Sequence, residues 1–300
     1  MRNRQSLLSR NFYPLSFILH TFVEVILLIS STQLPLHGKR ILVTAPRNYA
    51  MRFSNQLVNQ GALPLLMPTI ETCPLENFTE LDIALQKIEQ FDWIAFTSRN
   101  GIEAFFQRLD VLKINPLVLA KCRLCAIGID SEKLAAFGVK VDIVPTEPSP
   151  AGIIAELAKI PNIAKQTVLV PVPEVLGVPE PDVVPNFVAG LKQLGMNVTR
   201  VPTYMTRCLE KTIYEVELSL VRQGKVDAIA FSSTAEIMGF LKMIHSKSDY
   251  KNCVIACFGP YTAANAEKLG FKVSVVAKDY SSFAGFTDAI ASFFNQENKR

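Results

Sequence analysis

Two stretches of this chain that lie 134 residues apart are nearly the same. Residues 67–72 read MPTIET and residues 201–206 read VPTYMT, so Pro, Thr and Thr recur at matching places. One matching position differs in its chemistry, because Ile70 corresponds to Tyr204. Solenoid and propeller repeats have periods of about 20–50 residues. A repeat of this length therefore indicates a duplicated half-chain.

Two further pairs of segments keep nearly the same separation. Residues 92–98 (DWIAFTS) correspond to 227–233 (DAIAFSS), and 122–131 (CRLCAIGIDS) correspond to 253–262 (CVIACFGPYT). A chain of 300 residues is also long enough for about two domains of ordinary size. The sequence therefore predicts two copies of one α/β plan.

The net charge is concentrated near the N-terminus. Residues 1–40 carry five basic side chains and one acidic side chain, whereas 41–300 carry 26 of each. Because duplex binding needs clustered Lys and Arg, nucleic acid is not an expected partner. The chain has three His and neither of the glycine motifs that bind dinucleotides or nucleoside triphosphates. His-based hydrolases, His-rich metal sites and nucleotide-binding enzymes are therefore not expected functions.

The first 37 residues are predicted to be a targeting or disordered segment. Residues 15–29 are mostly apolar but contain Glu24, and they are shorter than the ~20 residues of a membrane helix. A presequence, a signal peptide and a non-native start are all open interpretations. We favour an organellar presequence, in a plastid, and expect a cytoplasmic protein if the segment is not one. No stable membrane partner is expected.

From residue 38 onward, short apolar runs alternate with segments of helical periodicity. In the first unit, 41–44 is strand-like, 51–60 has helical spacing and 63–67 is strand-like again. This alternation predicts parallel sheets with helical crossovers. Further strands are expected at 93–96, 122–127, 139–144, 167–171, 198–201 and 226–231. The proline-rich stretch 173–185 is predicted to be a long loop.

Hydroxyl side chains directly follow several predicted strands. At the carboxyl edge of a parallel sheet, such positions combine free backbone N–H groups, a helix N-terminus and a hydroxyl, which together favour bound anions. The same residue types are also ordinary helix caps. Several such positions in two lobes could cradle one large polyanion. The positions are Thr97, Ser98, Ser131, Ser232, Ser233 and Thr262.

Tyr204 has a side chain that can take part in acid–base chemistry, whereas Ile70, at the matching position of the first repeat, does not. A phenol can donate a proton or a hydrogen bond to a leaving hydroxyl, although its reference pKa of about 10 makes it a weak acid. Packing of the ring between lobes is an equally open role. Arg47, Arg99 and Arg207 lie near strand ends, where they could meet carboxylates or stay solvated.

Taken together, these segments resemble the uroporphyrinogen-III synthase family, whose members close the linear tetrapyrrole hydroxymethylbilane into a macrocycle while inverting its fourth ring. The resemblance covers about residues 38–294 and rests on the order and spacing of short motifs. These are Phe96 to Ile102, Ile127-Gly128-x-x-Ser131, Pro202-Thr203-Tyr204-x-Thr206, Phe231-Ser232-Ser233 and Gly259-Pro260-x-Thr262-Ala263 leading to Gly270. The chain departs from the family pattern at Ala45, where many members carry Arg, and in 173–185.

The resemblance implies two flavodoxin-like parallel-sheet lobes joined by a two-stranded linker. The implied division is 38–68 plus 207–297 for lobe one, 74–201 for lobe two, and 69–73 and 202–206 for the linkers.

The resemblance also implies an activity. The reaction is the cyclisation of hydroxymethylbilane with inversion of ring D, through a spirocyclic intermediate and with loss of water. It would proceed in a monomer without cofactor or metal. Tyr204 matches the tyrosine proposed to assist loss of the hydroxyl group. The residues implied or expected to contact substrate are Thr97, Ser98, Ser131, Ser233, Thr262 and Arg47.

Two other interpretations remain open from the sequence. One is a two-lobe tetrapyrrole-binding paralogue that has lost turnover, and the other is a two-lobe enzyme for nucleotides or sugars. Replacing Tyr204 should lower turnover more than ligand affinity if the protein is a synthase.

Overall fold

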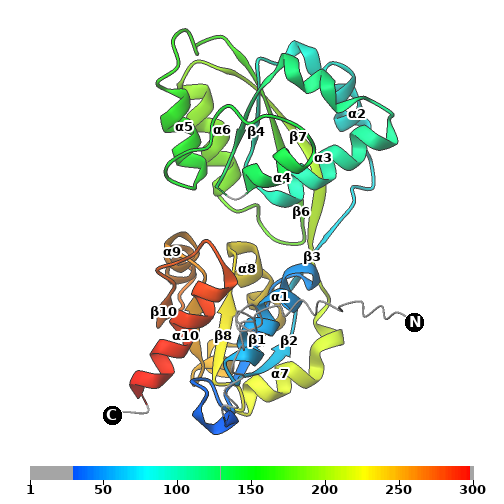
Figure 1. Ribbon diagram of the computed structural model, residues 1–300. Helices are drawn as coiled ribbons and strands as arrows, with labels where there is room; N and C mark the ends of the chain where they lie inside the picture. The colour runs from blue at the N-terminus through cyan, green and yellow to red at the C-terminus, as the bar shows by residue number, and fades with distance from the viewer. Residues whose placement is uncertain (1–29, 129, 298–300) are drawn as a thin grey trace, which may run out of the picture.

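The computed structural model describes residues 30–128 and 130–297, which form two α/β lobes (Figure 1). Lobe one is built around the sheet with strand order β10-β9-β8-β1-β2, and lobe two around the sheet with order β3-β7-β6-β4-β5. The strand pairs are parallel except that β3 and β7 are antiparallel. The predicted α/β class with two parallel-dominated sheets is therefore confirmed.

The strands and helices of lobe one are β1 (Arg40–Val43), α1 (Arg47–Asn59), β2 (Leu63–Leu66), α7 (Glu215–Arg222), β8 (Ala228–Phe231), α8 (Thr234–Met243), β9 (Val254–Cys257), α9 (Pro260–Lys268), β10 (Val275–Val276) and α10 (Phe283–Glu297). Those of lobe two are β3 (Ile70–Cys73), α2 (Thr79–Gln86), β4 (Trp93–Phe96), α3 (Arg99–Val111), β5 (Arg123–Ala126), α4 (Asp130–Ala136), α5 (Pro150–Leu157), β6 (Thr167–Leu176), α6 (Val183–Gln193) and β7 (Asn197–Cys208). Short 3-10 helices occupy Ser31–Gln33, Ile88–Gln90, Pro116–Lys121, Lys211–Tyr214 and Lys247–Tyr250.

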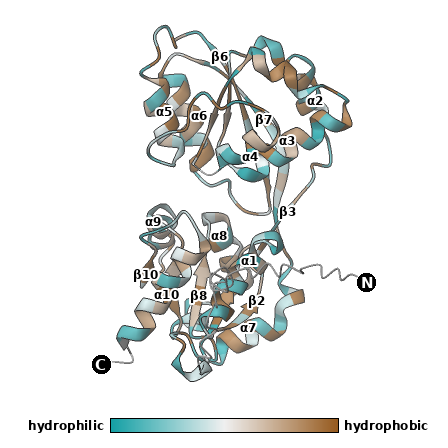
Figure 2. Ribbon diagram, viewed as in Figure 1, coloured by the Kyte–Doolittle hydropathy of each residue, from teal (hydrophilic) through white to brown (hydrophobic). Residues whose placement is uncertain are grey.

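Helices cover both faces of each sheet, which explains the continuous apolar runs of the strands. In lobe one, α1 and α10 pack on one face, where the rings of Phe53 and Phe286 stack at 5.0 Å, and α7, α8 and α9 pack on the other. In lobe two, α2, α3 and α4 cover one face while α5 and α6 cover the other. Figure 2 shows the strands in hydrophobic colours and hydrophilic segments on the surrounding helices.

The packed chain begins before residue 38. Leu36 is fully buried against α1 and β1, and its N–H donates to the carbonyl of Gln60 at 2.8 Å. Gly61 has φ +88°, and a Cβ there would lie 2.8 Å from the Cβ of Leu34, so a glycine ends α1 at this close approach. Most of the predicted segment 1–37, namely residues 1–29, lies outside the described residues. Within the described part, no helix has the length and apolar character needed to span a bilayer.

Two expectations about strands were wrong. The stretch predicted to be a loop from residue 173 continues as β6 through Leu176. Among the described residues, β6 pairs with β4 at Val168 and Leu169 and beyond that point with β7 alone. A proline that lacks an N–H is tolerated on such a free edge. The segment 139–144, predicted as a strand, forms one isolated bridge between Ile143 and Cys125.

Three strands form the junction of the lobes: β6 and β7 run toward lobe one, and β3 runs back into lobe two (Figure 1). β3 pairs with β7 from Ile70 opposite Cys208 to Cys73 opposite Met205, and β7 pairs with β6 as far as Arg207 opposite Leu176. Of the two segments expected to be linkers, 69–73 and 202–206, Thr72 and Cys73 of the first pair with Thr206 and Met205 of the second. The internal duplication and the exact division into domains stay predictions.

Candidate active site

A cavity of about 470 Å³ lies between the lobes, where the carboxyl ends of their parallel strands face each other. Residues just beyond β1, β4, β5, β8 and β9 contribute to it, together with β3, β6, β7 and the segment before α10. From lobe one it is lined by Pro46, Tyr49, Arg52, Ser232, Ser233, Ala235, Glu236, Phe258, Ser281, Ser282 and Phe283, and from lobe two by Ile70, Thr72, Thr97, Ser98, Arg99, Asn100, Asp130, Pro173, Val175, Glu180, Pro181, Val183, Val184, Tyr204 and Thr206.

Ser98 sits at the junction between β4 and α3 and caps the helix. Its backbone is extended, with φ −156°, and its Oγ accepts a hydrogen bond from the N–H of Gly101 at 3.1 Å. The same Oγ lies 3.2 Å from the phenol oxygen of Tyr204. Either hydroxyl can be the donor of this bond. When Ser98 donates, the phenol hydrogen is free to point at a ligand.

Tyr204 lies next to an irregularity in the strand pairing. The register of β7 against β6 shifts after Val172, so that Val172 faces Pro202 while Pro173 faces Tyr204. A bulge of this kind interrupts the in-and-out alternation of a strand and re-aims a side chain. Tyr204 is 8% exposed, and burial raises the pKa of its phenol to about 12, against a hydrogen bond from Ser98 that lowers it. The phenol therefore stays protonated at neutral pH and acts as a hydrogen-bond donor.

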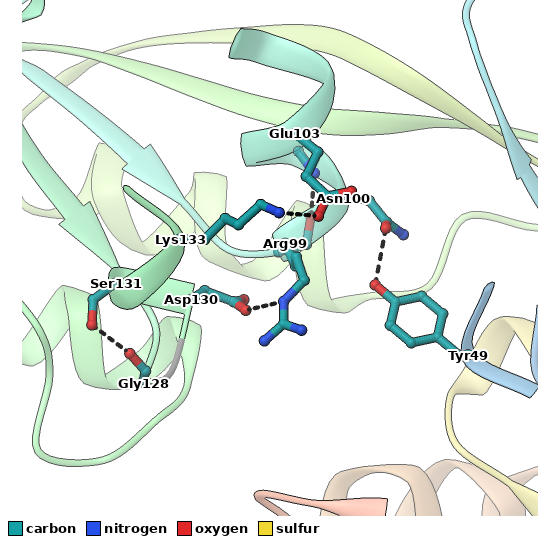
Figure 3. Close-up of polar contacts among 10 residues, drawn as sticks. Tyr49, Arg99, Asn100, Glu103, Gly128, Asp130, Ser131 and Lys133 are labelled. Carbon is teal, nitrogen blue, oxygen red and sulfur yellow. Dashed lines mark hydrogen bonds and ion pairs between the residues drawn. The ribbon is translucent and has the colours of Figure 1, made fainter. Parts of the chain in front are cut away.

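A hydrogen bond between Tyr49 and Asn100 joins the two lobes across the cavity. Tyr49, on α1 of lobe one, donates from its hydroxyl to Oδ1 of Asn100, on α3 of lobe two, at 2.9 Å (Figure 3). Both residues line the cavity. Burial raises the pKa of Tyr49, so its phenol remains a donor at neutral pH. This contact holds α1 against the start of α3.

Cationic groups reach the cavity from both lobes. Arg99 of lobe two lies with its Nε 3.3 Å from Oδ1 of Asp130 (Figure 3). Arg52 of lobe one is exposed and also lines the cavity. Burial raises the pKa of Asp130, and the neighbouring charge and hydrogen bond of Arg99 lower it. The two guanidinium groups give the cavity donors that suit carboxylates.

The junction between β8 and α8 forms the opposite wall. Ser233 caps α8 with φ −150° and accepts from the N–H of Glu236 at 3.4 Å. The carboxyl group of Glu236 is buried and accepts hydrogen bonds from the Ser232 N–H at 2.9 Å and from Ser233 Oγ at 3.0 Å. Thr44 Oγ1 lies 2.9 Å from this carboxyl group and also 2.9 Å from the carbonyl oxygen of Ala230, so its single hydrogen serves one of the two. Ser232 Oγ also donates to it at very short range. Burial raises the pKa of Glu236, and these donors oppose the rise.

The cavity includes four of the seven predicted site residues: Thr97, Ser98, Ser233 and Tyr204. Their roles stay predictions.

The other three predicted residues lie outside the lining. Ser131 donates its hydroxyl to the carbonyl of Gly128 at 2.8 Å (Figure 3), and Thr262 is buried in the first turn of α9. Arg47 is exposed at the start of α1, where its charge acts on Tyr214; burial raises the pKa of that tyrosine and Arg47 opposes the rise. None of the three belongs to the lining of the cavity.

The sequence reasoning missed Tyr49, Arg52, Asn100, Asp130 and Glu236. Asn100 and Glu236 each lie within three residues of a serine that was identified, so the first turn of each helix was the available signal. Tyr49 and Arg52 are one helical turn apart on α1. This helix belongs to the first strand–helix–strand unit of the chain, and nothing in the sequence indicated that it faces the second sheet. Within residues 30–128 and 130–297, no three His, Cys, Asp or Glu side chains are grouped so that they could hold a metal ion.

Comparisons with known proteins agree on one family. The sequence model of the family described as "Uroporphyrinogen-III synthase HemD" matches residues 51–286. A protein of Synechococcus elongatus called uroporphyrinogen-III synthase is 30% identical over 257 residues, covering 82% of this chain and 92% of that protein. A chloroplastic uroporphyrinogen-III synthase of Oryza sativa is 24% identical over 239 residues, covering 77% of this chain and 73% of that protein. A crystal structure of a mutant uroporphyrinogen III synthase from Thermus thermophilus has a similar fold, with a TM-score of 0.62, 17% identity, and coverage of 86% of this chain and 100% of that one.

Proposed function

Because the chain belongs to the uroporphyrinogen-III synthase family, we infer that it is a cofactor-independent lyase that closes hydroxymethylbilane into uroporphyrinogen III. The reaction inverts ring D through a spirocyclic intermediate and releases water. The observation that carries this inference is the match of the family over residues 51–286, which include the first turn of every helix that faces the cavity except α1. The substrate is a small tetrapyrrole.

The arrangement of groups supports a division of labour in the cavity. We propose that Tyr204 donates a hydrogen bond to the leaving hydroxyl, since its phenol stays protonated and Ser98 lies 3.2 Å from it. Arg52 and Arg99 are placed to receive substrate carboxylates. The remaining contribution is geometric. When the bilane is held between the two walls, its terminal rings lie close together, so the entropy cost of bringing the reacting atoms together is met on binding.

The isomer ratio of the product tests this function. Purified protein is given hydroxymethylbilane beside a control without protein, in which closure leaves ring D uninverted and yields isomer I. The expected product with protein is mainly isomer III. A ratio equal to the control, from protein shown to be folded by circular dichroism, would contradict the assignment and favour a tetrapyrrole-binding protein without turnover.

We further propose that the enzyme is a monomer in a plastid. A single chain supplies both walls of the cavity, so no second copy is needed to complete it. The chloroplastic relative from Oryza sativa and the basic, acid-poor composition of residues 1–40 support a plastid. Light scattering checks the mass in solution. A fluorescent protein fused to residues 1–40 should enter plastids, and its retention in the cytosol would contradict the location.

A further inference from the structure

The three carboxyl groups in the cavity lining differ in how many donors surround them. The carboxyl group of Glu236 is buried and surrounded by donors from its own wall. Both oxygens of Glu180 accept from the guanidinium group of Arg200, at 3.0 and 2.5 Å. The carboxyl group of Asp130 accepts one hydrogen bond within the described residues, at 3.3 Å from Arg99 Nε to Oδ1, and its Oδ2 accepts none. Asp130 is therefore the carboxyl group of this cavity with an oxygen left for a ligand.

Arg99 contacts Asp130 through one corner of its guanidinium group. Its Nε points at the carboxyl group, and its terminal nitrogens, which carry the other N–H donors, have no hydrogen-bond partner among the residues that the structure describes (Figure 3). A substrate carboxylate can bind these terminal nitrogens in the paired geometry that guanidinium groups favour. The pyrrole ring that bears this carboxylate would then lie beside Asp130. Arg99 is therefore placed to bring one ring of the bilane to the open oxygen.

The carboxyl group of Asp130 acts on the two phenols of the cavity. Burial is the main cause that raises the pKa of Tyr204, and the negative charge of Asp130 raises it further. The pKa of Tyr49, in lobe one, is also raised by burial; Arg99 lowers it and Asp130 raises it. The cavity thus combines a phenol that stays protonated with a carboxyl group within electrostatic reach of it.

The surroundings of Asp130 leave it ionised at neutral pH. Burial raises the pKa of its carboxyl group, the charge and hydrogen bond of Arg99 lower it, and the charge of Glu103 raises it. Glu103 is itself paired with Lys133 at 2.9 Å, so part of its charge is offset (Figure 3). Because the ordinary pKa of an aspartate is about 4, these opposing effects keep the group a carboxylate at pH 7. It can therefore accept a proton.

The balance of the cyclisation requires a proton acceptor. The hydroxyl group leaves from the methylene at one end of the bilane, and the free α-carbon of ring D loses its hydrogen at the other end. When this carbon forms its new carbon–carbon bond, it still carries the hydrogen, and the ring is a cation. Loss of the proton returns the C–H electron pair to the ring and restores the aromatic pyrrole. The hydroxide and this proton together make the water that is released.

We propose that Asp130 is a catalytic residue that accepts this proton through its open oxygen, an inference that rests on the proposed function. Tyr204 donates a hydrogen bond to the hydroxyl group as it leaves, and Asp130 receives the proton that ring D loses. Arg99 positions ring D by binding one of its carboxylates. The protonated Asp130 then gives its proton to hydroxide, which makes water and returns the carboxyl group to its starting state.

The test is Asp130→Asn, measured with hydroxymethylbilane that carries hydrogen or deuterium at the free α-carbon of ring D. Asparagine keeps an oxygen acceptor for Arg99 but takes up no proton, so water must do so. We expect kcat to fall about tenfold, less than the ~10²–10⁴ typical of general bases, because so acidic a proton can also pass to water. The deuterium isotope effect on kcat should rise, since loss of the proton becomes slower relative to the other steps.

The matched control is Asp82→Asn. Asp82 also lies in the first turn of a helix and is paired with an arginine, Arg108, but it is outside the cavity lining. Both kcat and the isotope effect should stay at their wild-type values. An aspartate that only held Arg99 in place would change KM and leave the isotope effect as it is.

A second variant keeps the proposal testable if Asp130→Asn folds poorly. Asp130→Ala leaves space for a small carboxylate, so formate in the buffer should restore part of its turnover and should not change that of Asp82→Asn. The proposal is overturned by a folded Asp130→Asn with wild-type kcat or with an unchanged isotope effect. Where only Asp130→Ala folds, a turnover that formate does not raise overturns it. The wild type's own yield of isomer III separates these outcomes from a failure of the proposed function.

Discussion

The two lobes present the same local frame to the cavity but fill its third helical position with different residues. In lobe two, β4 leads through Ser98 into α3, and in lobe one, β8 leads through Ser233 into α8. Both serines are extended caps, with φ −156° and −150°, and each accepts from the N–H of the third helical residue. That residue is Gly101 in lobe two and Glu236 in lobe one.

The difference decides what each wall can do. A Cβ at Gly101 would lie 3.1 Å from Ser98 Oγ and 3.9 Å from Cε1 of Tyr204, so the absence of a side chain leaves the serine free to meet the phenol. Glu236 fills the matching position, and the hydroxyl groups of Ser232 and Ser233 both donate to its carboxyl group. One frame thus places a hydroxyl pair, Ser98 with Tyr204, in the wall of lobe two and a buried carboxyl group, that of Glu236, behind the wall of lobe one.

The largest effect is expected from removing the phenol group of Tyr204. Tyr204→Phe keeps the ring and its packing but loses the hydrogen-bond donor, so kcat should fall about 10²-fold, with a smaller change in KM. Steady-state kinetics and the isomer ratio measure this. The control is Tyr250→Phe, because the buried hydroxyl of Tyr250 has no hydrogen-bond partner in the described structure and lies outside the cavity. Equal kinetics for the two variants would remove Tyr204 from the reaction.

The two capping serines offer a direct comparison of the walls. Ser98→Ala and Ser233→Ala should each lose about 1 kcal/mol of stability, because each removes a cap. Only Ser98→Ala also takes the partner of Tyr204 away, so its kcat should fall about tenfold, and that of Ser233→Ala by a few-fold. Ser149→Ala removes the cap of α5, to which Gly152 donates at 3.0 Å, and should cost stability alone. Identical kinetics in the first two variants would mean that the walls do not differ in function.

A smaller effect is expected from the bond between the lobes. Tyr49→Phe removes the donor to Asn100, a hydrogen bond with a net contribution of about 0.5–1.5 kcal/mol, so KM should rise about two- to tenfold while kcat changes little. Asn100→Ala removes the other partner. If the bond is what matters, the double variant should be no worse than the more impaired single variant. Fully additive losses would indicate that each residue acts separately.

The smallest effect is expected from the ion pair of Asp82 and Arg108, which lies in lobe two outside the cavity wall. Asp82 accepts two hydrogen bonds of 2.6 Å from Arg108, and this hydrogen bonding lowers the pKa of Asp82. A lowered folded-state pKa adds stability above the unfolded value near 4, and that stability is lost as pH falls through the folded value. Asp82→Asn should therefore lower the melting temperature by about 1–3 °C at pH 7 and by less at pH 3. Activity at pH 7 should be unchanged; a loss of turnover would show that the walls depend on distant parts of the lobe.

Local sequence patterns predicted most elements because they follow from short-range physics. Apolar runs such as 41–43 and 93–96 lie in strands buried on both faces, and Phe53 with Leu57 marks the inner side of α1. The prediction was wrong for the proline-rich part of β6. A proline disrupts a strand only where a neighbouring strand would accept a hydrogen bond from its N–H, and the sequence does not show which side of β6 is unpaired.

The sequence by itself determined the alternation of strands and helices, the serines that follow the strands, and the segments that identify the family. It could not decide which hydroxyls face the cavity: Ser131 follows a strand as Ser98 does, yet its hydroxyl bonds to its own backbone. Nor could it place the bulge beside Tyr204 or bring Tyr49 to Asn100, because register and lobe contacts arise between residues distant along the chain. Only the tertiary structure brought Thr44 within hydrogen-bond distance of Glu236. A buried carboxyl group needs hydrogen-bond partners, and here one of them comes from a neighbouring strand that is distant in sequence.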